Sequence, residues 1–359
     1  MSKSFQHLID LNDYPIPWWN KIIKLGHDIK NNPHKYSDVC KGKIMATLFY
    51  EPSTRTQMSF QTAMIRLGGN IIGFDNPTSS SVFKGESLKD TTKVISSYSD
   101  VLVIRHPSEG AAKAASLTSD CPVINAGDGG HLHPTQTLTD LLTLVEEKGR
   151  LHNLVVGLCG DLKNGRTVHS LCKALSCYPN NQFVLISTED LKLPAYVKDV
   201  LTVNNCKFTE VLSLDEAISE LDVLYMTRIQ KERFPSIEEY LAEKNTYILD
   251  RKKMLNAPRD MIVLHPLPRV EEITVEVDDD ERALYFKQAE YGVYIRMALI
   301  DTILKSKKGL QNLVGQTYLG VSCSNQRCIT NSEHYLPKSF SGIGDIVECE
   351  YCDERVLLK

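Results

Sequence analysis

Short apolar runs alternate with helix-like segments through most of this 359-residue chain. The runs that suit buried strands form two sets of four: 43–50, 70–74, 101–105 and 123–126, then 154–159, 183–187, 223–226 and 261–264. The helical patterns between them are 57–67, 87–97, 109–117, 167–177 and 214–220. Regular β–α alternation is typical of a parallel sheet covered by helices. The sequence therefore predicts an α/β protein with two parallel-sheet domains.

Two longer helical patterns lie outside these sets, and they suggest how the domains are joined. The pattern at 137–147 is expected to bridge the two domains, and another runs through 282–304. The predicted organisation is a first domain at 1–136, completed by a helix at about 287–305, and a second domain at 137–286. A polar linker at 306–318 and a small β-type module at 319–359 follow.

Polar motifs come directly after several predicted strands, where open parallel sheets bind their ligands. The sharpest is Ser53, Thr54, Arg55 and Thr56, between a strand and a helix. The free N–H groups and the dipole of a helix N-terminus favour an anion, and a guanidinium matches phosphate oxygens. A capping hydroxyl beside one surface arginine is the simpler alternative. However, Arg105, Arg166 and Arg228 also lie at predicted strand ends. Together with Arg55 they provide more anion-binding capacity than packing requires.

The chain shows no obvious catalytic nucleophile. It has no Ser-His-Asp order, kinase loop or nucleotide P-loop. The segment 160–166 lies between a strand and a helix but lacks the G-x-G-x-x-G spacing of a dinucleotide loop. A site rich in Arg, Thr, His and Gln suits a reaction in which the substrate supplies the nucleophile. The enzyme then positions two anions and stabilises an oxyanion.

Composition excludes some broad classes of function. The net charge of −4 gives no general attraction to nucleic acid. Residues 1–14 lack the apolar region of a signal peptide, and no apolar run approaches the length of a membrane span. A cytoplasmic location is therefore expected, where ten cysteines are not expected to form a disulfide framework.

Four cysteines near the C-terminus form two close pairs. Cys323 and Cys328 are followed, after twenty intervening residues, by Cys349 and Cys352. This is the spacing of a structural tetrathiolate zinc site, although a chance cluster of free thiols is the alternative. A module of about forty residues has little core, so the metal would contribute much of its folding free energy. Four protein ligands leave no open coordination position for catalysis.

The motif at residues 53–56 resembles the carbamoyl-phosphate loop of aspartate and ornithine carbamoyltransferases, and the resemblance extends to about residue 305. The later motifs are similar to an aspartate carbamoyltransferase catalytic chain. The stretches around the two cysteine pairs resemble the zinc domain of that enzyme's regulatory chain. The resemblance implies a fusion of the two without the intervening nucleotide-binding domain. Control by ATP or CTP through the usual route is then not expected.

The resemblance implies that the substrates are carbamoyl phosphate and L-aspartate, in pyrimidine biosynthesis, and that catalysis needs no cofactor. The roles that it implies fall into four groups. The phosphate would be held by Ser53, Thr54, Arg55 and Thr56. The carbamoyl carbonyl would be polarised by Arg105, His133 and Thr56, and its NH2 group held by Gln136 and the backbone carbonyls of Pro266 and Leu267. The aspartate carboxylates would be bound by Arg166, Arg228 and Gln230.

Ser80 and Lys84 resemble residues of the family's mobile loop, which reaches into a neighbouring subunit's site. A flexible surface loop with a solvated lysine is the simpler interpretation. The resemblance implies at least a homotrimer with shared active sites. The zinc module is expected to dock on a neighbour and hold trimers together. Glu51, Arg233 and Glu239 are expected to form ion pairs that favour a closed state.

Two alternatives stay open at this point. Ornithine carbamoyltransferases share the phosphate loop but carry a cysteine in the stretch that corresponds to residues 265–268, where this chain has none. Two guanidinium groups, from Arg166 and Arg228, suit a dicarboxylate better than a cationic amino acid. The second alternative is a non-catalytic assembly protein that keeps the fold. Such a protein would have no physical need for the whole set of polar side chains.

Overall fold

The computed structural model describes residues 7–77, 81–229, 234, 236–238, 240, 246–306, 313–342 and 344–358. The chain divides into two compact units: unit 1 comprises Met1–Thr135 and Val293–Lys359, and unit 2 comprises Gln136–Gly292. The boundaries fall inside two helices, α5 (Pro134–Lys148) and α11 (Tyr285–Lys305). Four residues named above lie outside the described residues: Ser80, Gln230, Arg233 and Glu239.

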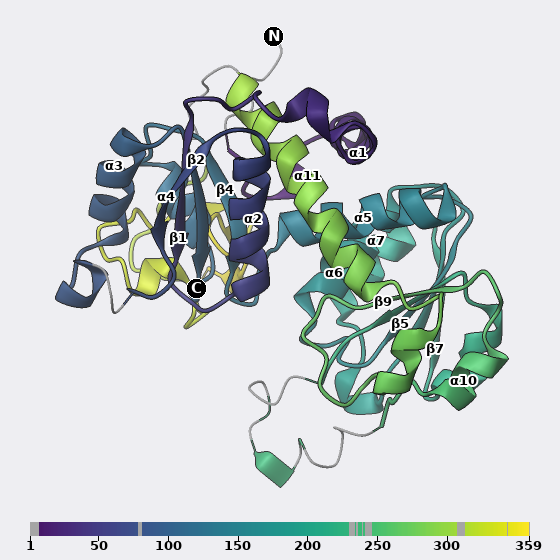
Figure 1. The fold of residues 1–359 in the computed structure, drawn as a ribbon. Coiled ribbons are helices and arrows are strands. Elements are labelled where there is room, and N and C mark those ends of the chain that lie inside the picture. Colours follow the sequence, from purple (N-terminus) through teal and green to yellow (C-terminus); the bar gives the residue numbers. More distant parts are fainter. Residues whose placement is uncertain are drawn as a thin grey trace. The chain divides into compact units, whose positions relative to one another are not determined.

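Unit 1 contains a parallel four-stranded sheet in the order β2-β1-β3-β4. Its strands are β1 (Ile44–Phe49), β2 (Asn70–Phe74), β3 (Val101–His106) and β4 (Val123–Asp128). Its helices are α1 (Ile16–Asn31), α2 (Thr54–Arg66), α3 (Leu88–Tyr98) and α4 (Ala111–Ser116). Helix α2 covers one face of the sheet, and α3 and α4 cover the other (Figure 1). Because both faces are covered, the inner strands β1 and β3 are largely continuous apolar runs rather than alternating ones.

Unit 2 contains a parallel five-stranded sheet in the order β7-β6-β5-β8-β9. Its strands are β5 (Val155–Cys159), β6 (Gln182–Ile186), β7 (Lys207–Val211), β8 (Val223–Met226) and β9 (Ile262–Leu264). Its helices include α6 (Arg166–Ser176), α7 (Ala195–Val203), α8 (Leu214–Ala217) and α10 (Arg251–Asn256). Strand β7 was missed by the sequence analysis. It is a largely exposed edge strand, so it lacks the apolar run that marks the buried strands.

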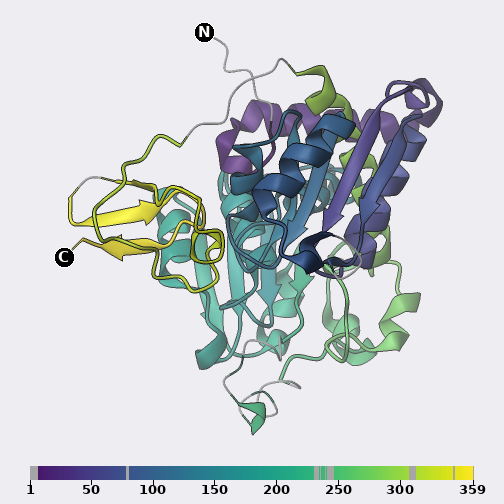
Figure 2. The same cartoon turned by 90° about the vertical axis from the view of Figure 1, so that its left-hand side faces the viewer.

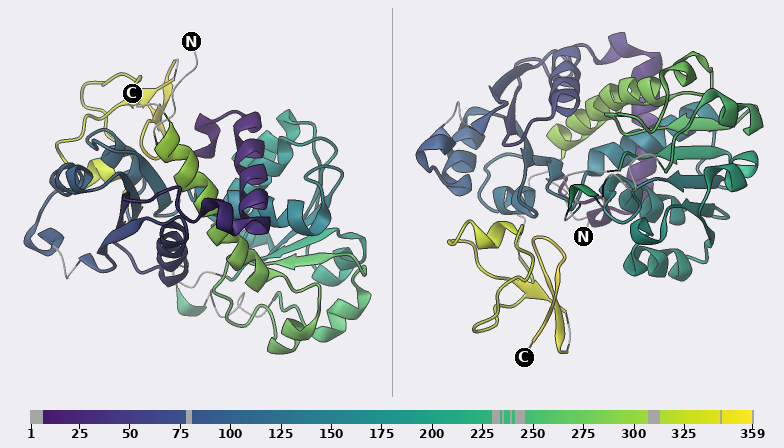
Figure 3. Two further views of the ribbon diagram at one scale, coloured as in Figure 1. Left: turned by 45° about the horizontal axis from the view of Figure 1, so that its top comes forward. Right: turned by 90° about the horizontal axis from the view of Figure 1, so that it is seen from below.

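The C-terminal module is a small antiparallel sheet, drawn in yellow in Figures 2 and 3, in the order β10-β11-β12. The strands are β10 (Phe340–Ser341), β11 (Ile346–Cys349) and β12 (Arg355–Leu357). The buried side chains Phe340, Val347 and Tyr351 form its core together with the four cysteines. This core is continuous with that of the first sheet of unit 1. The predicted fold class, two parallel-sheet α/β domains with a β-type module, is confirmed.

Among the helices that the structure describes, none combines the length and the apolar character that crossing a bilayer would require.

Candidate active site

The polar motifs of unit 1 lie at the topological switch point of its sheet, where the order in which strands are added reverses. From β1, the chain adds β2 on one side and β3 on the other, which leaves a gap between the connections at the carboxyl ends of β1 and β3. Ligands of open α/β sheets bind at such a point. Ser53 follows β1, and Arg105 is in the last part of β3. The strand order places these residues at the carboxyl ends of neighbouring strands.

The loop after β1 leads into α2 without a side-chain cap. Ser53 occupies the N-cap position, yet its hydroxyl makes no capping hydrogen bond. Thr54, Arg55 and Thr56 form the first turn of the helix. The first N–H groups of α2 therefore have no side-chain acceptor at the cap. Free N–H groups at a helix N-terminus favour an anion there. Partial burial, and then the positive charge of Arg105, lower the pKa of Arg55.

Arg105 is a mostly buried guanidinium whose hydrogen bonds are incomplete. One terminal nitrogen forms an ion pair with Glu51 at 2.6 Å, and the other donates to the carbonyl of Ala126 at 3.1 Å. Its Nε is buried and has no hydrogen-bond partner among the described residues. Burial lowers the pKa of Arg105, and the charge of Glu51 opposes that shift. A buried N–H without an acceptor is costly, so the chain itself satisfies this guanidinium only in part.

His133 lies at the end of a loop that a buried carboxylate organises. Asp128 is 1% exposed and accepts hydrogen bonds from the backbone of Gly110 at 2.8 Å and of Leu132 at 3.1 Å. The Asn125 amide donates to the same carboxylate at 3.1 Å. His133 itself is 6% exposed, so little of its ring faces solvent. The loop is thus fixed immediately before the imidazole.

Unit 2 has the same kind of switch point, between β5 and β8. Arg166 begins α6 after β5, and Arg228 follows β8, so both arginines lie at the carboxyl ends of neighbouring strands. Gly160 lets the two connections approach. Its φ is +117°, and a Cβ there would lie 2.4 Å from the Thr227 carbonyl oxygen. The glycine after β5 is therefore needed for close packing of the loops and not for a dinucleotide.

The remaining predicted residues are distributed over both units. Gln136 lies in the first turn of α5, and the half-buried Pro266 and Leu267 follow β9, next to β8 in the sheet. Lys84 is exposed at the end of the short 3-10 helix η4 (Ser81–Lys84). The structure therefore associates Ser53, Thr54, Arg55, Thr56, Lys84, Arg105 and His133 with unit 1, and Gln136, Arg166, Arg228, Pro266 and Leu267 with unit 2.

The four C-terminal cysteines form one buried cluster. Their sulfur atoms all lie within 4.8 Å of one another. The Cys323 and Cys352 sulfurs are 3.5 Å apart, and those of Cys328 and Cys349 are 3.8 Å apart. Thiolates bound tetrahedrally to Zn²⁺ would be about 3.8 Å apart, whereas a disulfide would bring them to about 2 Å. The donor set and the spacing therefore fit a tetrathiolate metal site.

The module that carries these cysteines contacts its own chain. Glu109 pairs with the backbone beside Cys328, because its N–H donates to the carbonyl of Arg327 at 2.9 Å and its carbonyl accepts from Ile329 at 2.9 Å. The Asn325 amide donates to the Glu109 carboxylate at 2.6 Å. The expected docking on a neighbouring chain stays a prediction, to which the structure adds this contact within unit 1.

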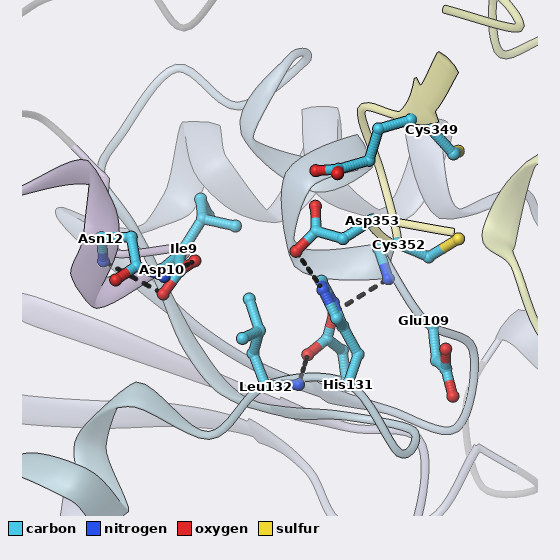
Figure 4. A network of polar contacts seen from close by, with 12 residues as sticks. Ile9, Asp10, Asn12, Glu109, His131, Leu132, Cys349, Cys352 and Asp353 are labelled. Carbon is cyan, nitrogen blue, oxygen red and sulfur yellow. Dashed lines mark hydrogen bonds and ion pairs between the residues drawn. The ribbon is translucent and has the colours of Figure 1, made fainter. Parts of the chain in front are cut away.

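A histidine joins the module to the loop before His133. The His131 ring lies between two carboxylates, with Nδ1 at 3.1 Å from Asp128 and Nε2 at 2.8 Å from Asp353. Figure 4 shows His131 pointing toward Asp353. Burial lowers the pKa of His131, but the charges and hydrogen bonds of Asp128 and Asp353 together raise it by more. The net pKa therefore lies well above the ordinary value. Sequence reasoning missed this contact, because no local pattern relates residues 222 positions apart.

Family models of known proteins match three consecutive stretches of the chain. A family model described as the carbamoyl-P binding domain of aspartate/ornithine carbamoyltransferase matches residues 6–146. Models of the Asp/Orn binding domain and of the aspartate carbamoyltransferase regulatory chain, metal binding domain, match residues 152–303 and 317–357. The aspartate carbamoyltransferase catalytic subunits of Clostridium perfringens (strain SM101 / Type A) and Clostridium novyi (strain NT) are each 59% identical over 300 and 299 residues. Each match covers 83% of this chain and 98% of the relative.

The chain belongs to the aspartate/ornithine carbamoyltransferase family. Among solved structures, the catalytic subunit of M. jannaschii aspartate transcarbamoylase is similar, with a TM-score of 0.79 and 47% identity. That match covers 84% of this chain and 98% of the other. The Trypanosoma cruzi enzyme in complex with N-(phosphonacetyl)-L-aspartic acid gives a TM-score of 0.78 and 37% identity, over 84% of this chain and 96% of the other. The sequence resemblance to an aspartate carbamoyltransferase catalytic chain joined to a regulatory-chain zinc domain is confirmed.

The contact between the module and α4 generates a test. At Gly110, φ is +84°, and an added Cβ would lie 2.6 Å from the Tyr351 carbonyl oxygen. We expect Gly110→Ala to loosen the module, so that hydrogen exchange accelerates in residues 109–115 and 323–358. Gly42→Ala is the matched control, because φ is +77° and nothing lies within 4 Å of the added Cβ. Equal protection of both segments in the two variants would contradict the contact.

Proposed function

We propose that the chain transfers the carbamoyl group of carbamoyl phosphate to L-aspartate, forming N-carbamoyl-L-aspartate and phosphate for pyrimidine synthesis. The observation that carries the proposal is a pair of arginines at the switch point of each sheet: Arg55 and Arg105 in unit 1, and Arg166 and Arg228 in unit 2. Two separate cationic sites suit one anionic acyl phosphate and one dicarboxylate. A cytoplasmic location fits such a biosynthetic enzyme.

Unit 1 would bind carbamoyl phosphate. The uncapped start of α2, with Ser53, Thr54, Arg55 and Thr56, holds the phosphate through N–H groups, hydroxyls and one guanidinium. The carbonyl oxygen would be stabilised by Arg105, His133 and Thr56. These donors stabilise the negative charge that develops on this oxygen in the transition state.

Unit 2 would bind the amine substrate and the NH2 group of the carbamoyl moiety. Arg166 and Arg228 pair with the two carboxylates of aspartate, and Gln230 completes that set. Gln136 and the backbone carbonyls of Pro266 and Leu267 accept hydrogen bonds from the carbamoyl NH2 group. Ser80 and Lys84 are assigned to the site of a neighbouring subunit.

The substrates supply the reacting groups. The α-amino nitrogen of aspartate attacks the carbamoyl carbon, and the bond between that carbon and the phosphate oxygen breaks. The departing phosphate takes the proton that the amine loses, so the atoms and charges balance without a side-chain base. The contribution of the protein is orientation and electrostatic stabilisation.

Aspartate is favoured over ornithine as the acceptor. A dicarboxylate matches two guanidinium groups, whereas a second ammonium group would be repelled by them. The similar Clostridium and M. jannaschii proteins bear the name of the aspartate enzyme. Structures of the Trypanosoma cruzi enzyme contain carbamoyl phosphate and aspartate.

The two arginine pairs predict different kinetic defects. We expect Arg55→Ala to lower kcat about 100-fold, because a donor to the reacting phosphate is lost. We expect Arg166→Ala to raise KM for aspartate roughly 30-fold or more, because a charged pair is truncated. Arg259→Ala is the control, since this exposed side chain precedes β9 and lies at the opposite end of its strand. Unchanged kinetics in both test variants would refute the assignment.

The cysteine cluster would hold a structural Zn²⁺ that fixes the module and takes no part in the chemistry. All four cysteines are buried, and a fourfold protein ligand set leaves no position for substrate. Zinc binding to such sites contributes folding free energy directly. The metal would therefore support the shape of the module against which Glu109 and His131 pack.

The active unit would be a trimer with shared sites. Support comes from apolar side chains that unit 1 leaves in solvent: Met58 and Ile65 on α2 are 60% and 58% exposed, and Ile72 on the edge strand β2 is 40% exposed. Phe83, beside Lys84, is 76% exposed. Met58 and Ile65 are seven residues apart and so lie on one face of α2, and an exposed apolar face is typical of an association surface. The zinc module would then join trimers into a larger assembly.

Removal of the metal tests this architecture. We expect Cys328→Ser to lose the metal and the larger assembly while a trimer and its turnover per site largely remain. Metal analysis and light scattering measure the two properties. Cys177→Ser is the control, because Cys177 is an exposed cysteine outside the cluster. A metal-free variant that keeps the mass of the unmodified protein would count against an assembly role for the zinc module.

A further inference from the structure

A fully buried carboxylate in unit 2 has no role in the reaction as described above. Asp140 lies on α5, one turn after Gln136, and is 0% exposed. Its Oδ1 accepts hydrogen bonds from the amide nitrogens of Gln136 at 2.8 Å and Gln288 at 2.6 Å. Its Oδ2 accepts from the Tyr225 hydroxyl at 3.1 Å. A buried carboxylate requires several donors of this kind, so the position of each donor is defined by it.

The first consequence is the orientation of the Gln136 side chain. An amide can present either its oxygen or its nitrogen to a partner, and an ionised carboxylate can only accept. The nitrogen of Gln136 must therefore face Asp140, and the oxygen remains as the acceptor that Gln136 can offer a ligand. The NH2 group of a carbamoyl moiety only donates, so it requires an oxygen at this position.

The second consequence concerns the turn after β9. Gln288 lies on α11 and is 1% exposed; its amide oxygen accepts from the backbone N–H of His265 at 2.9 Å. His265 Nδ1 accepts from the N–H of Leu267 at 2.7 Å. The proton of that imidazole is then on Nε2, which donates to Glu272 at 2.8 Å. Gln288 thus connects the turn that contains Pro266 and Leu267 to the same carboxylate that orients Gln136.

We propose that Asp140 and Gln288 are positioning residues. They fix the Gln136 amide oxygen and the carbonyls of Pro266 and Leu267 relative to one another, so that both can accept from the carbamoyl NH2 group. The inference rests on the proposed function and deepens it, because it assigns the selection of carbamoyl phosphate over other acyl phosphates to this buried network. The Gln136 amide oxygen is set by Asp140, and the carbonyls of Pro266 and Leu267 are set through Gln288. Neither positioning residue touches the substrate.

Acetyl phosphate separates this role from a general structural one. It keeps the phosphate and the carbonyl of carbamoyl phosphate but has a methyl group in place of NH2. Loss of the network should therefore weaken the use of carbamoyl phosphate and leave acetyl phosphate binding unchanged. A general distortion of the site would weaken both ligands alike.

The experiment compares Gln288→Met and Asp140→Ala with the unmodified protein. For each, kcat/KM for carbamoyl phosphate at saturating aspartate and the inhibition constant of acetyl phosphate are measured. We expect kcat/KM to fall at least tenfold, with the inhibition constant unchanged within twofold. Two variants are used because Asp140→Ala leaves three buried donors to be rehydrated and is the more disruptive change.

Thr143→Ala is the matched control. Thr143 is buried on the same helix, and its hydroxyl donates to the Thr139 carbonyl at 2.8 Å, outside the network. Its Tm should fall, but the ratio of the two constants should not change more than twofold. The proposal is overturned if both constants of the test variants worsen by the same factor, or if neither changes. If the unmodified protein neither carbamoylates aspartate nor binds either acyl phosphate, the proposed function itself fails.

Discussion

Positive charge gathered at the carboxyl ends of both sheets is the constraint that the rest of the structure must accommodate. In unit 1, Arg105 is mostly buried and acts on the pKa of Arg55, so two cations share one edge of the sheet. Glu51 compensates only part of this charge, and one guanidinium N–H keeps no acceptor among the described residues. Two neighbouring cations with incomplete compensation repel each other, so an anion bound between them would be stabilised.

In each unit a buried aspartate, Asp128 or Asp140, accepts hydrogen bonds from several polar segments. Asp128 in unit 1 accepts hydrogen bonds from backbone N–H groups at the start of α4 and in the loop before His133. Asp140 in unit 2 collects the amides of Gln136 and Gln288. A buried carboxylate cannot tolerate missing donors, so it holds several segments in one geometry more strictly than a neutral acceptor would. Side chains on these segments are thereby held in a geometry that the sheets beneath them define.

The C-terminal module is too small to form an independent hydrophobic core. Its buried side chains are continuous with those around α4, whose alanines allow close approach. Its four clustered cysteines would add cohesion by holding a metal ion. His131 and Asp353 then place this module in contact with Asp128. The same buried carboxylate therefore contacts both the metal-binding module and the loop that carries His133. This is a physical route by which the order of one can affect the other.

Local signals in the sequence determined the two β–α sets, the polar start of α2, the arginines at strand ends and the paired cysteines. Each of these depends on residues that are close along the chain: an apolar run, a helix N-terminus or a spacing of two to four residues. Only the tertiary structure decided the strand orders that make Arg105 a neighbour of Ser53, and Arg228 a neighbour of Arg166. It also decided the partners of the buried aspartates, because a carboxylate at 140 and an amide at 288 carry no mark of one another until the fold removes both from water. Strand β7 could not be recognised in the sequence because it is an edge strand in contact with solvent, and such a strand needs no apolar run.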